Sequence, residues 1–344
     1  EGKRLEPGIE RHTYYFRTFG NKNSILGVEP VSKLSFRKGG EDSQPGSVEC
    51  IDILNHIANL RKFAYFCHMI NPLAKILKGI RHYLRLKRMP MRLEFVVTDY
   101  CNLNCRGCTH YSPLAPREFE QLERLSLSMK QLAGICGSKV KSAYLIGGET
   151  LLYPHLIEAM EALRKYFTTQ KLYIFTNGLA LPKMSDEFFD TARRLDFIVA
   201  VTRYPIKFDY DKVLNDLRTR RVKTEVFGDR SMADSFFRFA LDPKGRQNAR
   251  LSHFKCYNRG CMSIVGDRLY PCSISACVGH LNKAHGMAFE HHDKDYLRIP
   301  DIESFSQIRR LREKPVPFCR YCIYPVDTVR YAPSKHGKEE WVED

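Results

Sequence analysis

The pattern of hydrophobic and polar positions changes near Met91. From there to about Arg250, short apolar stretches alternate with amphipathic ones. The apolar stretches predict five strands, at about 93–98, 140–146, 172–176, 197–202 and 222–227. The amphipathic stretches predict helices near 119–136, 155–167, 186–195 and 210–219. Apolar strands joined by helices indicate an α/β fold with a parallel sheet, which either curls into a barrel or stays open and doubly wound.

The segments on either side follow other patterns. Residues 1–50 show no periodicity, whereas residues 51–88 have helical spacing and end in a basic amphipathic helix. Beyond about Arg250 the alternation stops, and residues 264–270 predict a tight hairpin with Gly-Asp at its turn. We therefore expect an N-terminal, partly helical extension (1–90), an α/β domain (91–250) and a small Cys-rich C-terminal domain with its tail (251–344).

The chain carries a formal net charge of +16. Part of this excess is local, because the segment from Lys75 to Arg92 is basic and contains no acidic residue. Such a segment suits an acidic partner or an anionic membrane surface, although basic amphipathic helices more often pack on their own protein. With neither an apolar run of about 20 residues nor a signal-peptide pattern, the sequence predicts a cytoplasmic protein and leaves attachment to a membrane surface open.

The 12 cysteines gather at short spacings, which indicates metal binding in a reducing compartment rather than disulfides. Cys101, Cys105 and Cys108 follow the first predicted strand. Thiolates at this spacing can hold one iron–sulfur cluster with three ligands, which leaves one iron of a cubane open to a small molecule. A zinc site completed by His110 is the alternative.

Two further motifs lie at strand ends. Gly147-Gly148-Glu149-Thr150 follows the second strand, and Thr176-Asn177-Gly178 closes the third. With the Cys-x3-Cys-x2-Cys spacing, they make the chain resemble the radical S-adenosylmethionine (SAM) enzymes over roughly residues 91–228. The resemblance implies a partial (β/α)6 TIM-type barrel, whose active site lies at the C-terminal ends of the strands.

The resemblance also implies the cofactors. The three cysteines would ligate a [4Fe-4S] cluster whose open iron binds SAM, and reductive cleavage of SAM would yield a 5′-deoxyadenosyl radical that abstracts a hydrogen atom from the substrate. The family's motifs place SAM against Gly147, Gly148, Glu149, Thr150, Thr176 and Asn177. Glu149 would bind its amino group, and Arg203, after the fourth strand, is a candidate for its carboxylate.

Two positions depart from the family pattern. Thr150 stands where the family usually has proline, and Gly107 stands where many members have an aromatic residue. The second departure removes the usual side-chain contact to adenine. Tyr111 is a candidate replacement, with packing on the barrel rim as the alternative role.

The late cysteines resemble a second site. Cys319-Arg-Tyr-Cys322, with Cys272 and one upstream cysteine, resembles the auxiliary-cluster domain called Twitch, the short form of SPASM. One auxiliary [4Fe-4S] cluster is expected, with a structural zinc ion as the alternative. The fourth ligand stays open between Cys256, which fits the family spacing, and Cys261, which the hairpin places opposite Cys272. Cys277 is the spare thiol.

These features predict a radical SAM enzyme of the oxidoreductase or epimerase type. An auxiliary cluster favours oxidation of a sugar-like or aminocyclitol carbon, with epimerisation as the close alternative. A maturase that modifies a ribosomal peptide is the second hypothesis. The expected partners are a small-molecule or peptide substrate and a flavodoxin- or ferredoxin-type electron donor. A metal-bearing nucleic-acid-binding protein is the non-enzyme alternative, but it gives the Gly-Gly-Glu motif no role, so nucleic acid is not expected.

Overall fold

The computed structural model describes residues 77, 80, 84, 90–227 and 235–343. The chain divides into two compact units, residues 1–82 and 83–344, and the account below concerns the second. The helices expected within residues 51–88 and the segment before them lie outside the described residues, apart from the single helical positions Leu77, Ile80 and Leu84.

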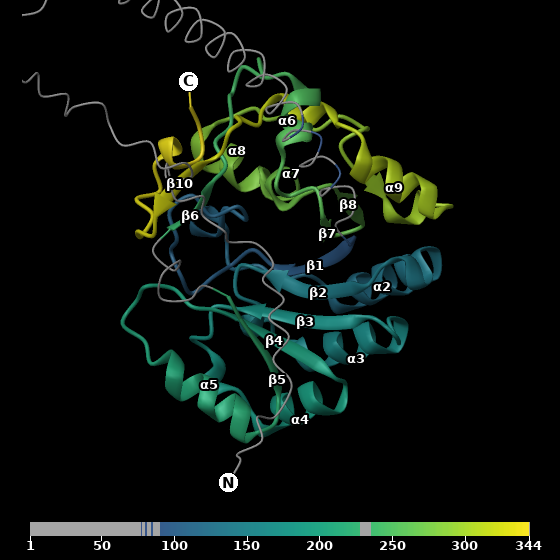
Figure 1. The fold of residues 1–344 in the computed structure, drawn as a ribbon, viewed down its shortest axis with the longest axis vertical. Coiled ribbons are helices and arrows are strands. Elements are labelled where there is room, and N and C mark those ends of the chain that lie inside the picture. Colours follow the sequence, from purple (N-terminus) through teal and green to yellow (C-terminus); the bar gives the residue numbers. More distant parts are fainter. Residues whose placement is uncertain (1–76, 78–79, 81–83, 85–89, 228–234, 344) are drawn as a thin grey trace, which may run out of the picture. The chain divides into compact units, whose positions relative to one another are not determined.

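An eight-stranded sheet forms the centre of this unit, with the strand order β5-β4-β3-β2-β1-β7-β8-β9 (Figure 1). The strands β1 to β5 and β7 run parallel, and β8 pairs antiparallel with both β7 and β9. The strand bounds are β1 Arg92–Thr98, β2 Ser142–Gly147, β3 Lys171–Thr176, β4 Phe197–Thr202, β5 Lys223–Phe227, β7 Cys261–Val265, β8 Arg268–Tyr270 and β9 Leu297–Arg298.

Four helices connect the first five strands, as the alternating pattern predicts: α2 Leu122–Cys136, α3 Leu156–Tyr166, α4 Asp186–Arg194 and α5 Tyr210–Thr219. Polar caps fix where two of them begin. The Ser185 side chain accepts a hydrogen bond from the Phe188 backbone N–H at the start of α4, and Asp209 does the same for Lys212 at the start of α5. Because neighbouring strands follow one another in sequence, right-handed crossovers place these helices on one face of the sheet.

Side chains alternate between the two faces of the sheet. Leu93, Ala143 and Leu172 belong to the main hydrophobic core, which the helices also line. Tyr144, Tyr173 and Ala200 form a separate, smaller cluster on the opposite face. The helix-free face is therefore aromatic and polar rather than aliphatic.

The α/β fold with a partial TIM-type barrel is confirmed, but its sixth parallel strand has an unexpected source. It does not follow β5 along the chain. Instead β7, from the Cys-rich region, pairs with β1 on the side away from β2. The strand that does follow, β6 (Ser235–Arg238), pairs with β10 (Asp327–Arg330) in a separate two-stranded sheet.

The predicted hairpin is confirmed as β7–β8. Val265 pairs with Arg268 across a two-residue turn, in which Gly266 has a positive φ of 61°. The paired residues end at Ser263 and Tyr270. This is the register expected for Cys261 opposite Cys272, but the pairing stops two residues before them, and Cys272 is the N-cap residue of helix α7.

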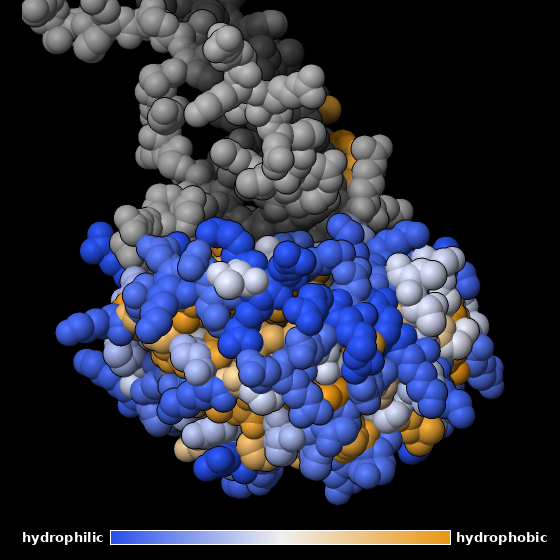
Figure 2. Space-filling model, turned by 90° about the horizontal axis from the view of Figure 1, so that it is seen from below, coloured by the Kyte–Doolittle hydropathy of each residue, from blue (hydrophilic) through white to orange (hydrophobic). Residues whose placement is uncertain are grey.

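Four short helices lie in the C-terminal region around this hairpin: α6 Ala249–Lys255, α7 Ser273–Cys277, α8 Gly279–His285 and α9 Phe305–Glu313. Figure 2 views the unit from the side that carries α4 and α5, where hydrophilic residues dominate and hydrophobic ones are scattered. Arg194 of α4 forms an ion pair with Glu161 of α3, and Arg220, at the C-cap of α5, forms one with Asp186 of α4. Within the described ranges, every helix is too short or too polar to cross a lipid bilayer.

Candidate functional site

The segment Cys101–Cys108, called the cluster loop below, leaves the C-terminal end of β1. Its three cysteines are half-buried free thiols. Burial raises the pKa of Cys101 and Cys105 to about 12, so these sulfurs carry protons unless a metal displaces them. The Cys101 sulfur already accepts hydrogen bonds from the Leu103 backbone N–H at 3.3 Å and from the Asn177 side chain at 3.7 Å. Binding of a metal centre to the first two cysteines would therefore displace protons from their thiols.

The two glycines of the Gly-Gly-Glu motif contact the backbone that leads into this loop. A Cβ atom on Gly148 would lie 2.3 Å from the carbonyl oxygen of Tyr100, and one on Gly147 would lie 1.9 Å from that of Thr98. The Gly148 backbone N–H donates to Thr98 at 2.7 Å, and the Glu149 N–H donates to Tyr100 at 2.9 Å. These positions need glycine because two backbones touch there.

Glu149 is fully buried, and its carboxylate joins two strand ends. Its Oε1 accepts hydrogen bonds from the Leu151 N–H at 3.0 Å and the Thr176 hydroxyl at 2.7 Å, and its Oε2 accepts one from the Asn177 N–H at 2.8 Å. Burial raises the pKa of this carboxyl, while the three hydrogen bonds act in the opposite direction. The side chain holds the end of β2 against the end of β3.

Asn177 completes the connection to the cluster loop. Its side-chain amide donates to the Asn102 side chain at 2.7 Å, and its backbone carbonyl accepts from the Tyr210 hydroxyl at 3.1 Å. The three motifs, at residues 101–108, 147–150 and 176–178, therefore meet at the C-terminal ends of the strands.

The remaining candidates have varied surroundings. Arg203 pairs with Asp211 at 3.1 Å and lies over the Tyr210 ring. Thr150 is fully buried, and its hydroxyl has no hydrogen-bond partner in the described part of the chain. Gly107 has a positive φ of 68°, a conformation that an aromatic residue would adopt only with strain.

Tyr111 is buried at 1% exposure, and its ring lies 5.9 Å from that of Trp341. Its hydroxyl donates to the Ile274 carbonyl at 3.5 Å. The structure thus gives it a packing role between the cluster loop and α7.

The C-terminal tail covers the cluster loop, a contact that motif spacing does not reveal. The Trp341 indole N–H donates to the Cys108 carbonyl at 2.9 Å. The Arg106 N–H donates to Ala332 at 2.9 Å, and the Ser334 N–H donates to Asn104 at 2.8 Å. The tail therefore fixes the backbone that carries the three thiols.

A second group of thiols lines one cavity in the C-terminal region: Cys256, Cys272, Cys319 and Cys322. Cys261 lies outside this group. Its sulfur accepts a hydrogen bond from the Arg92 guanidinium at 2.8 Å. Arg92 is also the residue of β1 with which Cys261 of β7 pairs. Asp295 holds the backbone next to this group, because its carboxylate accepts a hydrogen bond of 2.6 Å from the N–H of Phe318, the neighbour of Cys319.

The spacing of these sulfurs bears on which metal they suit. A zinc ion with four thiolates at about 2.3 Å holds its sulfurs about 3.8 Å apart. Within the described residues, neither cysteine group places three sulfurs within 4.8 Å of one another. All-thiol donor sets are found in iron–sulfur clusters and in structural zinc sites alike.

Comparisons with known proteins agree with these motifs. The chain is 29% identical over 150 residues to GTP 3',8-cyclase of Staphylococcus epidermidis, a radical SAM enzyme. The chain resembles the radical SAM enzymes. Members of this family use a [4Fe-4S] cluster and SAM. The match covers 40% of this chain and only 40% of the length of the curated relatives. No family model matches the sequence.

Among solved structures, the chain is similar to two proteins whose structures contain SAM. BtrN in complex with AdoMet and 2-DOIA has a TM-score of 0.44 and 17% identity, over 69% of this chain and 94% of BtrN. Streptococcus suis SuiB bound to S-adenosylmethionine has a TM-score of 0.31 and 15% identity, over 45% of this chain and 37% of SuiB.

Proposed function

We propose that this chain is a radical SAM enzyme that oxidises, or alternatively epimerises, a carbon of a sugar-like or aminocyclitol substrate. The observation that carries the oxidative choice is the gathering of four thiols around one cavity, with Cys261 elsewhere. Four thiolates occupy all four irons of a cubane, so such a cluster keeps no open iron and serves as an electron carrier. It can then accept the electron that an oxidised substrate radical gives up.

Cys101, Cys105 and Cys108 would hold the first cluster, which leaves one iron for SAM. When bound, these two cofactors supply the 5′-deoxyadenosyl radical that begins the reaction. The residues of this chain set the geometry. The Gly147–Gly148 backbone stays against the cluster loop, and Glu149 fixes the strand ends around it. To bind the SAM carboxylate, Arg203 would have to break its ion pair with Asp211, whose side chain is exposed. Breaking such a surface ion pair costs little free energy.

The helix-free face of the sheet supports a hydroxyl-rich substrate. Tyr173 donates a hydrogen bond to Glu225 at 3.2 Å, and Ser263 donates one to Glu94 at 3.3 Å. Carboxylates and hydroxyls in these positions can exchange hydrogen bonds with substrate hydroxyl groups. A long peptide would need an extended apolar or backbone-pairing surface instead, so we rank peptide modification second.

The first cluster needs one electron per cleavage of SAM, which we expect from a flavodoxin- or ferredoxin-type donor. The activity test uses anaerobically prepared protein with reduced flavodoxin and SAM. We expect 5′-deoxyadenosine and methionine in equal amounts, and none from the Cys101→Ala variant. Absence of 5′-deoxyadenosine from protein with its full iron content would contradict the proposed function.

A matched pair of cysteine variants tests the auxiliary cluster. Cys256→Ala removes a lining thiol and should lose about four irons per chain, whereas Cys261→Ala should keep them all. With a substrate in hand, reaction in D2O separates the two chemistries: an epimerised product carries solvent deuterium at the attacked carbon, and an oxidised product does not. Equal iron loss in both variants would remove the four-thiol assignment.

A further inference from the structure

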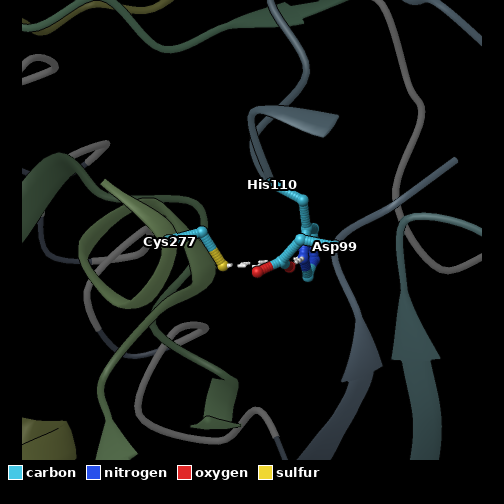
Figure 3. Close-up of side chains that lie close together, drawn as sticks. All are labelled: Asp99, His110 and Cys277. Carbon is cyan, nitrogen blue, oxygen red and sulfur yellow. Dashed lines mark hydrogen bonds and ion pairs between the residues drawn. The ribbon is translucent and has the colours of Figure 1, made fainter. Parts of the chain in front are cut away.

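A buried group of metal-type side chains lies beside the cluster loop and serves neither proposed cluster (Figure 3). Asp99 follows β1, His110 follows the cluster loop, and Cys277 ends α7. Asp99 Oδ1 lies 3.2 Å from His110 Nδ1 and 3.4 Å from Cys277 Sγ, and Sγ lies 3.7 Å from Nδ1. Within the described residues, no other trio of His, Cys, Asp or Glu has all its ligand atoms within 4.8 Å of one another.

The three distances match those between ligands of one ion. A hydrogen-bonded chain of three groups needs two short distances, whereas ligands around a common centre need three. A tetrahedral zinc ion binds oxygen and nitrogen at about 2.0–2.1 Å and sulfur at about 2.3 Å, which puts the ligand atoms about 3.3–3.6 Å apart. The distances of 3.2, 3.4 and 3.7 Å lie within about 0.2 Å of these values.

The surroundings supply what a metal site needs. The side chains of Asp99 and His110 are 14% and 9% exposed, and Cys277 is 3% exposed. The second carboxylate oxygen of Asp99 lies 2.9 Å from His280 Nε2, outside the trio. This is the hydrogen bond that commonly orients a ligating carboxylate from the outer shell.

We propose that Asp99, His110 and Cys277 bind a zinc ion, with a fourth position open to water or to a substrate oxygen. Three protein ligands and one exchangeable position are typical of zinc sites that take part in chemistry. Asp99 lies two residues before Cys101, and His110 lies two residues after Cys108. The ion would join both ends of the cluster loop to α7, the helix that Cys272 caps. This site goes beyond the proposed function and does not depend on SAM cleavage.

The test measures zinc directly in the anaerobically purified protein with its clusters. Zinc and iron per chain are counted by mass spectrometry, and zinc coordination is read from absorption at the zinc K-edge, to which iron does not contribute. We expect about one zinc per chain, bound by one sulfur and by nitrogen or oxygen atoms. Cys277→Ala and the near-isosteric Asp99→Asn should each lower zinc at least tenfold while iron stays unchanged. Cys136→Ala, at another buried free thiol, is the control and should keep both metals.

Three outcomes would overturn the proposal. The first is that the wild-type protein retains no zinc after desalting. The second is that the zinc has sulfur ligands only and survives in Cys277→Ala. The third is that Cys136→Ala loses zinc to the same extent as the two site variants. A sulfur-only zinc would also displace the auxiliary cluster, which the iron count detects separately. Failure of the zinc site with full iron and normal SAM cleavage leaves the proposed function standing.

Discussion

The hydroxyl of Thr176 donates a hydrogen bond of 2.7 Å to the buried carboxylate of Glu149. The two residues belong to different motifs, at the ends of β3 and β2, and the same carboxylate also accepts the Asn177 N–H. Because Asn177 in turn contacts Asn102 in the cluster loop, the three motifs form one connected unit. A substitution in any of the three motifs should therefore alter the geometry of the cysteines.

Glu149→Gln should destabilise the protein and weaken SAM binding together. The glutamine amide has one acceptor oxygen where the carboxylate has two, so its NH2 group would face a backbone or hydroxyl donor. This leaves buried hydrogen-bonding groups unpaired, at a cost of about 2 kcal/mol. Urea unfolding and SAM titration measure the two effects. Thr176→Val removes one hydrogen bond and should cost about 1 kcal/mol. A Gln variant as stable as the wild type would show that the carboxylate does not organise the strand ends.

Gly148→Ala should displace the cluster loop. Its methyl group would meet the carbonyl oxygens of Tyr100 and Asp99 at 2.3 and 2.4 Å, and backbone atoms cannot move aside cheaply. We expect loss of most of the iron held by the loop. Gly134→Ala, at an exposed site in α2 with no atom within 4 Å, is the matched control and should be neutral or stabilising by up to about 1 kcal/mol. Full iron content in Gly148→Ala would refute the close backbone approach.

Thr150→Pro should be tolerated. Thr150 opens a short 3-10 helix, where proline is favoured, and Glu149 before it has φ −127° and ψ 110°, near the conformation that a residue before proline prefers. The lost hydroxyl has no partner within the described residues. Thermal unfolding should show no loss of stability and a gain of up to about 1 kcal/mol. A large loss would mean that the threonine side chain binds something essential.

Trp341→Ala should loosen the tail and expose the cluster loop. The side chain is 1% exposed, so truncation should cost about 3–5 kcal/mol. Trp341→Phe keeps an aromatic ring but loses the hydrogen bond to Cys108, for a cost of about 1 kcal/mol. Iron release in air, followed by absorbance, should be fastest in the Ala variant. Equal rates in all three proteins would show that the tail does not protect the loop.

Sequence patterns predicted the parts of this structure that depend on neighbours along the chain. The strands and helices from β1 to β5 follow from apolar periodicity, and the three motifs lie where β1, β2 and β3 end. Long-range geometry escaped prediction. Nothing local indicates that β7 pairs with β1, which carries Cys261 to Arg92 and away from the other thiols. The contact of Asp99 with Cys277 joins residues 178 positions apart, and no spacing rule covers it.

The most direct test of the account is the iron and acid-labile sulfide content per chain after anaerobic reconstitution. The wild type is compared with a variant in which Cys101, Cys105 and Cys108 are all alanine. Two four-iron clusters predict about eight irons in the wild type and about four in the variant. About four irons falling to none would contradict the account, because the thiols at Cys256, Cys272, Cys319 and Cys322 would then hold no cluster and the proposed oxidation would lose its electron acceptor.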